Sequence, residues 1–160
     1  EAERRGLPIL RSVPEALKTI LKPESVAMFR KYGVFTEAEL RSRYEVYYED
    51  FKTRSRIEGE LALIMARTVI NPAVVRHLKQ IGAAGAATVP ALDAELEVAG
   101  SLYGELTKAE AALEEVLPTG DPELIRARQA ELRKLVDRLE KVVDDELWPL
   151  PKYRELLFIY

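Results

Sequence analysis

A long stretch without proline, from Thr36 to Asn71, constrains the fold more than any other feature of the chain. Thr36 and Glu39 have the spacing of a capping box, with the threonine at the N-cap and the glutamate three residues into the helix. At 1.5 Å per residue the stretch would form a helix of roughly 50 Å. Pro72 should end or kink this helix, because its ring clashes with the carbonyl one turn earlier.

Apolar side chains recur along this stretch at helical spacing, which predicts the face that is buried. The middle of the stripe is weak, because Arg54, Ser55 and Glu58 take the place of apolar residues. We expect that middle section to face solvent when the chain is alone. The predicted stripe consists of Leu40, Tyr44, Tyr47, Phe51, Leu61, Met65 and Thr68.

The rest of the chain also has helical periodicity, and no segment shows the two-residue alternation of a strand. Asp121 at an N-cap and Pro122 at the first helical position predict the start of the last long helix. In that helix Ile125, Leu132 and Leu139 recur every seven residues, as in a bundle seam. The sequence therefore predicts an all-α fold, a bundle of three long antiparallel helices in a single domain, 1–160. Its parts are a short-helix lead-in (1–35), a long helix with a proline kink (36–79), a hinge (80–89), two further long helices (90–117 and 121–147) and a docked extended C-terminal tail (148–160).

Composition excludes several classes of protein. The 160 residues include no cysteine, so a disulfide framework and a thiolate metal site are excluded, and we predict a cytoplasmic protein. The net charge is -3 and no segment carries a dense basic patch, so we expect no nucleic-acid partner. The longest uncharged stretch, Gln80 to Leu92, is short and rich in alanine and glycine, so we expect no membrane partner. The first residues hold neither an initiator methionine nor a signal-peptide core, so the chain looks cut from something longer.

Few groups in the sequence could form a chemical site. His77 is the only histidine, whereas carboxylate-bridged metal sites in bundles need Glu-x-x-His on two helices, so we interpret it as a surface or packing residue. Gly82 and Gly85 are not followed by the Gly-Lys-Ser/Thr of a phosphate-binding loop. We therefore predict no catalytic residue, no metal ligand and no cofactor in this chain. The acidic residues that intrahelical ion pairs explain include Glu45, Glu49, Glu58 and Glu60.

The C-terminal tail is different, because it combines apolar residues with a sequence that cannot be helical. Two prolines remove backbone donors and bias the residues before them toward extended conformations. The apolar area is too large to remain in water at a free end. Two alternatives remain open: the tail packs on the core of its own bundle, which we favour, or it fills a groove on a neighbouring domain or subunit. The candidate docking residues are Trp148, Pro149, Leu150, Pro151, Tyr153 and Phe158.

Several stretches resemble, in order along the chain, the carboxy-terminal part of type III glutamine synthetases. They include "FRKYGVFTEAELRSRYEVYYEDF", "IEGELALIMARTVINPAV" and "LWPLPKYRELLF". The most specific are the run Glu-Leu-Arg-Ser-Arg-Tyr-Glu that starts at Glu39 and the Trp-Pro-Leu-Pro that starts at Trp148. The resemblance covers nearly the whole chain and is weakest from Gln80 to about Ala130.

The resemblance implies a parent enzyme that makes glutamine from glutamate and ammonia with ATP and Mg or Mn. In that family the active site lies in other domains, so no catalytic residue is carried over to this chain. The resemblance implies a non-catalytic domain in nitrogen metabolism that covers the catalytic domain of the same polypeptide and helps neighbouring subunits assemble. The weak middle of the long helix would then face the catalytic domain. The alternative is a free-standing helical adaptor that binds a partner through its helices and tail.

Overall fold

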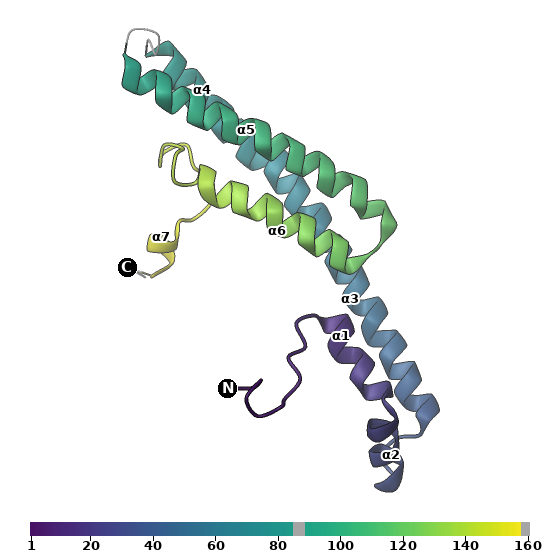
Figure 1. Cartoon of the computed structure of the whole chain (residues 1–160). Helices are drawn as coiled ribbons and strands as arrows, with labels where there is room; N and C mark the ends of the chain where they lie inside the picture. Colours follow the sequence, from purple (N-terminus) through teal and green to yellow (C-terminus); the bar gives the residue numbers. More distant parts are fainter. Residues whose placement is uncertain (85–88, 158–160) are drawn as a thin grey trace. The chain divides into compact units, whose positions relative to one another are not determined.

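The computed structural model of the chain describes residues 1–84 and 89–157, apart from the side chains of residues 153 and 154. None of the described residues lies in a strand, and long helices dominate (Figure 1). The prediction of an all-α fold is confirmed. The finer arrangement, a bundle of three antiparallel helices with a docked tail, stays a prediction.

The chain divides into two compact units, unit 1 (Glu1–Arg56) and unit 2 (Ile57–Tyr160). The boundary lies inside the long helix α3 (Glu37–Met65), which contributes residues to both units. Unit 1 also holds α1 (Val13–Lys18), the 3₁₀ turn η1 (Thr19–Leu21) and α2 (Pro23–Lys31). The remaining elements of unit 2 are the π-helical turn η2 (Ala66–Ile70), α4 (Asn71–Ala83), α5 (Pro90–Val116), the 3₁₀ turn η4 (Leu117–Thr119), α6 (Pro122–Leu139) and α7 (Tyr153–Leu157).

Local signals set the helix ends of unit 1. After α2, Gly33 has a φ of 63°, and the Val34 amide donates to the Phe29 carbonyl at 3.0 Å, as in a Schellman motif. The predicted capping box is confirmed: the Glu39 amide donates to Thr36 Oγ1 at 3.3 Å, and the Thr36 amide donates to a Glu39 carboxylate oxygen at 2.7 Å. The first turn of α3 is therefore stabilised by its own side chains.

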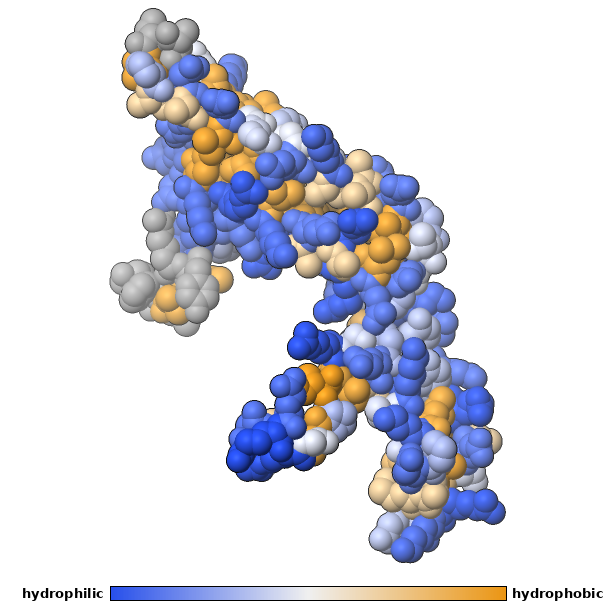
Figure 2. All heavy atoms as spheres, viewed as in Figure 1, coloured by the Kyte–Doolittle hydropathy of each residue, from blue (hydrophilic) through white to orange (hydrophobic). Residues whose placement is uncertain are grey.

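Unit 1 buries few side chains of its own. Pro14, Leu40 and Ser55 are buried, and the Phe29 and Phe35 rings lie 5.6 Å apart. Apolar side chains reach the surface in unit 1 as patches among charged residues (Figure 2). The large apolar residues that remain exposed are Leu7, Ile9, Leu10, Val13, Met28, Tyr32, Val34, Val46 and Tyr47.

The helix α3 continues without a break through η2 and α4, from Glu37 to Ala83. Pro72 lies just after the π-helical turn, so the helix continues past the proline with a local departure from α-helical geometry. Among the described residues this is the one helix long and apolar enough to cross a membrane, with a mean hydropathy of 1.2 over its best window. A core helix passes the same test, and the apolar residues Leu63, Ala66, Ile70 and Val74 of this segment pack into the core of unit 2.

The core of unit 2 forms where α5 packs against α6 and α4 packs against α5. The predicted seven-residue repeat of α6 is confirmed, since Ile125, Leu132 and Leu139 are all buried. At Gly59 the backbone of α3 approaches so closely that a Cβ atom would lie 2.8 Å from a methyl carbon of Ile125. The absence of a side chain at this position therefore lets α3 pack tightly against the core.

Three details of the prediction were wrong. The third long helix ends at Leu139 instead of residue 147. In the turn that follows, the Asp144 amide donates to His77 Nδ1 at 3.4 Å and the Asp144 carboxylate accepts from the Glu146 amide at 2.9 Å. Residues 80–83 belong to α4, so the hinge does not begin at residue 80, and residues 85–88 of it lie outside the described residues. In the weak middle of the stripe, which was expected to face solvent, Arg54 and Glu58 are exposed but Ser55 is buried.

The stripe itself was also placed on the wrong face after residue 56. Leu61 and Thr68 are exposed, whereas Leu63, Ala66 and Ile70 are buried. The helix carries apolar residues on both faces in this region, and helical spacing alone does not say which face the rest of the chain covers. Packing against α5 and α6 determines which face is buried.

Candidate functional site

The tail after α6 brings the only tryptophan back to the core of unit 2. The chain turns at Asp144, and the Asp144 carbonyl accepts hydrogen bonds from the amides of Leu147 and Trp148, each at 3.0 Å. The Trp148 side chain is 8% exposed and belongs to the same buried cluster as Ile70, Leu132 and other core residues. A large aromatic surface is thereby removed from water.

The other predicted tail residues lie in different environments. Leu150 is partly buried and packs against the core, whereas Pro149 and Pro151 are exposed. Lys152 pairs with Asp145 across the turn. The side chain of Tyr153 and all of Phe158 lie outside the described residues. The role of this set as a docking or interaction site stays a prediction.

A groove of about 660 Å³ lies between α3–η2, α6 and this tail. Charged residues line its rim, and two of them, Arg133 and Asp137, form an ion pair at 2.8 Å. The apolar lining suits an aliphatic or aromatic surface better than a charged ligand. The apolar residues of the lining are Ala62, Met65, Ala66, Ile70, Leu132, Val136, Trp148, Leu150 and Pro151.

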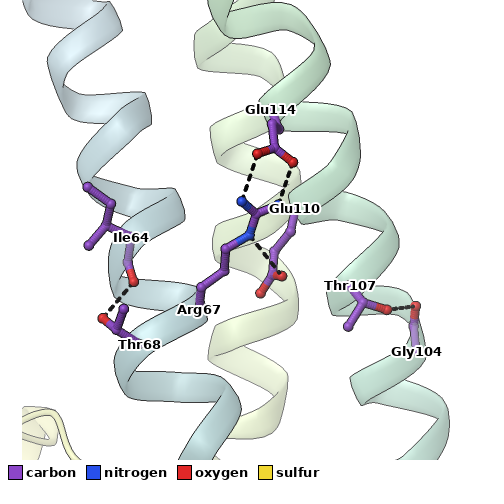
Figure 3. Close-up of polar contacts among 7 residues, drawn as sticks. All are labelled: Ile64, Arg67, Thr68, Gly104, Thr107, Glu110 and Glu114. Atoms are coloured by element: carbon purple, nitrogen blue, oxygen red, sulfur yellow. Dashed lines mark hydrogen bonds and ion pairs between the residues drawn. The ribbon is translucent and has the colours of Figure 1, made fainter.

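A polar cluster joins the π-helical turn to α5 (Figure 3). The guanidinium of Arg67 makes two parallel hydrogen bonds to the carboxylate of Glu114, at 2.8 and 2.5 Å. Its Nε lies 3.7 Å from a carboxylate oxygen of Glu110, which is 4% exposed. This geometry holds η2 and α5 in one register, since a bidentate arginine–carboxylate pair has strict directional requirements.

The pKa values of the two glutamates in this cluster are shifted in opposite directions by their surroundings. Burial raises the pKa of Glu110, although hydrogen bonds from Asn71 and Arg67 oppose the shift. The hydrogen bond from Arg67 lowers the pKa of Glu114, which is exposed. One carboxylate oxygen of Glu110 has no hydrogen-bond partner among the described residues, so its burial is incompletely compensated.

His77 is buried, which confirms its interpretation as a packing residue. Its Nδ1 accepts from the Asp144 amide, and its Nε2 lies 3.9 Å from a carboxylate oxygen of Glu95 on α5. The imidazole thus connects α4 to the turn after α6. Among residues 1–84 and 89–157 no group of three or more His, Cys, Asp or Glu side chains is arranged to hold a metal ion.

Sequence reasoning missed the polar cluster, although two signals could have revealed it. Arg67 is the only charged residue between Glu60 and Arg76, so it interrupts an otherwise uncharged stretch. Glu110 lies four residues after Leu106 and three before Leu113, which places it on the buried face of its helix. A charge on a predicted core face requires a partner, and Arg67 supplies it.

Comparison of the sequence with known proteins relates the chain to glutamine synthetases. A family described as the glutamine synthetase C-terminal domain matches residues 1–88, which include unit 1, α3 and α4 but not α5 or α6. A type-3 glutamine synthetase of Dictyostelium discoideum is 26% identical to 99% of the chain. Glutamine synthetases of Butyrivibrio fibrisolvens and Bacteroides fragilis (strain YCH46) are 29% and 30% identical, again over 99% of the chain. The chain spans about a quarter of the length of these relatives, 25% in each case.

Proposed function

The chain belongs to the glutamine synthetase C-terminal domain family, and on that premise we propose that it is the non-catalytic helical domain of a type III glutamine synthetase. The observation that carries the proposal is the match of nearly the whole chain to one quarter of each relative, one of which is a type-3 enzyme. In this proposal the chain is one part of a longer polypeptide.

The parent polypeptide makes glutamine from glutamate, ammonia and ATP in the cytoplasm, and it binds ATP and Mg or Mn. The residues described here do not offer a site for those ions, since no suitable cluster of ligands is present among them. The metals and the nucleotide bind to other domains of the parent.

The role of the domain is to cover the catalytic domain of the same polypeptide and to help neighbouring subunits assemble. The exposed apolar residues of unit 1 support this role, because a self-contained domain of that size would be expected to bury more of them. Interfaces between domains of one chain are typically 600–1,500 Å² and tolerate polar rims, which suits a surface of mixed apolar patches and charges.

The proposal is tested by comparing three proteins: this chain alone, the parent polypeptide and the parent without this region. We expect glutamine formation from the parent and none from the chain alone. We expect the parent without this region to form smaller assemblies in sedimentation velocity. Glutamine formation by the chain alone would refute the non-catalytic role, and a parent reading frame without a catalytic domain would favour the free-standing adaptor.

A further inference from the structure

One face of the long helix in unit 2 carries aliphatic side chains that the described residues of the chain leave exposed. Ile57, Leu61 and Ile64 on α3 are 53%, 53% and 57% exposed, and Val75 on α4 is 48% exposed. Ile57, Leu61 and Ile64 lie four and three residues apart, which places them along one side of α3, and Val75 follows beyond the π-helical turn that contains Thr68. We call these four aliphatic residues the outer stripe.

Two polar residues next to the outer stripe, Thr68 and Arg67, already have partners in the chain. The Thr68 hydroxyl donates to the Ile64 carbonyl at 2.7 Å, so it does not depend on solvent (Figure 3). From Leu61 to Val75 the only charged residue is Arg67, and both Glu114 and Glu110 pair with it. This length of helix therefore has no free charge with which to solvate its exposed side.

The same turns also carry an inner apolar face. Leu63, Ala66, Ile70 and Val74 are buried in the core of unit 2. A surface helix of a soluble protein normally has one apolar face and one polar face, and a helix that is apolar on two faces is covered on both. The chain covers the inner face, so the outer stripe requires a second partner.

We propose that the outer stripe is the docking surface for the catalytic part of the parent polypeptide, which contacts it through an uncharged, aliphatic surface. This inference rests on the proposed function, and it identifies which face of the domain meets the enzyme. The outer stripe lies within residues 1–88, the part that matches the family, whereas α5 and α6 lie beyond it. Three quarters of the length of the relatives lies outside this chain, so covering chain is available in the parent.

The size of the outer stripe favours a tethered domain over a second copy of the chain. Half-exposed aliphatic side chains of this number form a patch of roughly a few hundred Å². A stable complex of separate proteins buries about 800 Å² on each partner. A covalent tether raises the effective concentration to about the millimolar range, so a smaller contact is sufficient within one polypeptide.

Cysteine labelling tests this inference, because the chain contains no cysteine of its own. Leu61→Cys and Ile64→Cys are introduced singly into the chain alone and into the parent polypeptide. The matched control is Val98→Cys on α5, since Val98 is 51% exposed and lies outside the outer stripe. The rate of alkylation at each position is read by mass spectrometry of the peptide that contains it.

We expect both stripe cysteines to react rapidly in the chain alone and at least about tenfold more slowly in the parent, relative to Val98→Cys. Equal rates in the two proteins, in a parent that forms glutamine, would overturn the inference and leave the proposed function intact. Slow labelling that already appears in the chain alone and deepens with its concentration would assign the stripe to a second copy. Slow labelling of the chain alone only when phosphatidylcholine vesicles are added would assign it to a membrane, and either result overturns the inference.

Discussion

Unit 1 and unit 2 are both built from helices with clear start and stop signals, but they differ in what those helices bury. Unit 2 has a continuous core that joins α3, η2, α4, α5, α6 and the tail. In unit 1 the only buried residues are Pro14, Leu40 and Ser55. The comparison shows that local signals are sufficient to form helices, whereas a stable core also requires side chains that are distant in sequence to meet.

The largest expected effect comes from the core of unit 2. Trp148→Ala should lower the free energy of unfolding by about 3–5 kcal/mol, because it empties a buried aromatic site. Denaturant unfolding followed by far-UV circular dichroism measures the loss. The matched change in unit 1, Tyr32→Ala at a residue 71% exposed, should cost less than about 0.5 kcal/mol. Comparable losses for the two variants would break the comparison between the units.

In the unmutated chain, the fluorescence of Trp148 reports whether its side chain is shielded from water. A blue-shifted emission that iodide quenches poorly is expected for a side chain that is 8% exposed. A water-like emission with full quenching would contradict the burial of the tail.

The next effect concerns the close packing of α3 in unit 2. Gly59→Ala should destabilise the chain by about 1–3 kcal/mol, because the new methyl group would meet Ile125 and Leu117 at 2.8 and 3.0 Å. The control is Gly104→Ala in α5, where a Cβ atom meets nothing within 4 Å. That variant should stabilise the helix by about 0.5–1 kcal/mol. Thermal unfolding of both variants checks the prediction, and the same sign of change in the two would refute it.

Each unit contains a helix whose N-cap side chain accepts hydrogen bonds from backbone amides, so removing each cap compares the two units directly. Asp121 accepts from the amides of Glu123 and Leu124 at 2.9 and 3.2 Å in unit 2, and Thr36 caps α3 in unit 1. Removing either side chain should cost about 1 kcal/mol. We expect Asp121→Ala to lower the global stability, whereas Thr36→Ala should mainly increase hydrogen exchange in the first turn of α3. Equal shifts in global unfolding would indicate that unit 1 is as cooperative as unit 2.

The smallest effect is a pH dependence in the polar cluster. Because burial raises the pKa of Glu110 in the folded state, the folded state binds the proton more tightly than the unfolded state does. The free energy of unfolding should therefore fall as the pH rises from the ordinary carboxyl pKa through the raised one. Glu110→Gln should remove this dependence, which denaturant unfolding of both proteins over a series of pH values measures. If the free energy of unfolding had the same pH dependence in the variant and in the wild type, this prediction would be contradicted.

Much of the secondary structure could be predicted, because the signals that specify helix ends act within one turn. The capping box at Thr36, the C-cap at Gly33 and the N-cap at Asp121 are all present as the sequence indicated. The seven-residue repeat of α6 also identified its buried face, since that helix has one apolar side. The end of α6 at Leu139 was missed, because no proline or glycine marks it before Pro149. The turn that follows contacts His77, which lies 67 residues away in sequence.

The candidate sites were predicted less completely. Trp148 was singled out as part of an apolar tail whose prolines prevent a helix, and the structure places it in the core. The cluster of Arg67, Glu110 and Glu114 was missed, because its members come from two helices and become neighbours only when those helices pack. A charge that is far from its partner in sequence gives no local signal of that partner.

The sequence by itself determined that the chain is helical, where most of its helices begin and which family it resembles. These properties depend on backbone capping, on proline geometry and on the spacing of residues within single helices. Only the tertiary structure decided that Leu63 and Ile70 turn inward while Leu61 and Ile64 remain exposed. Both faces of this helix are apolar, so burying either one yields a similar free energy per unit area. The partner that is present, α5 together with α6, therefore selects the face.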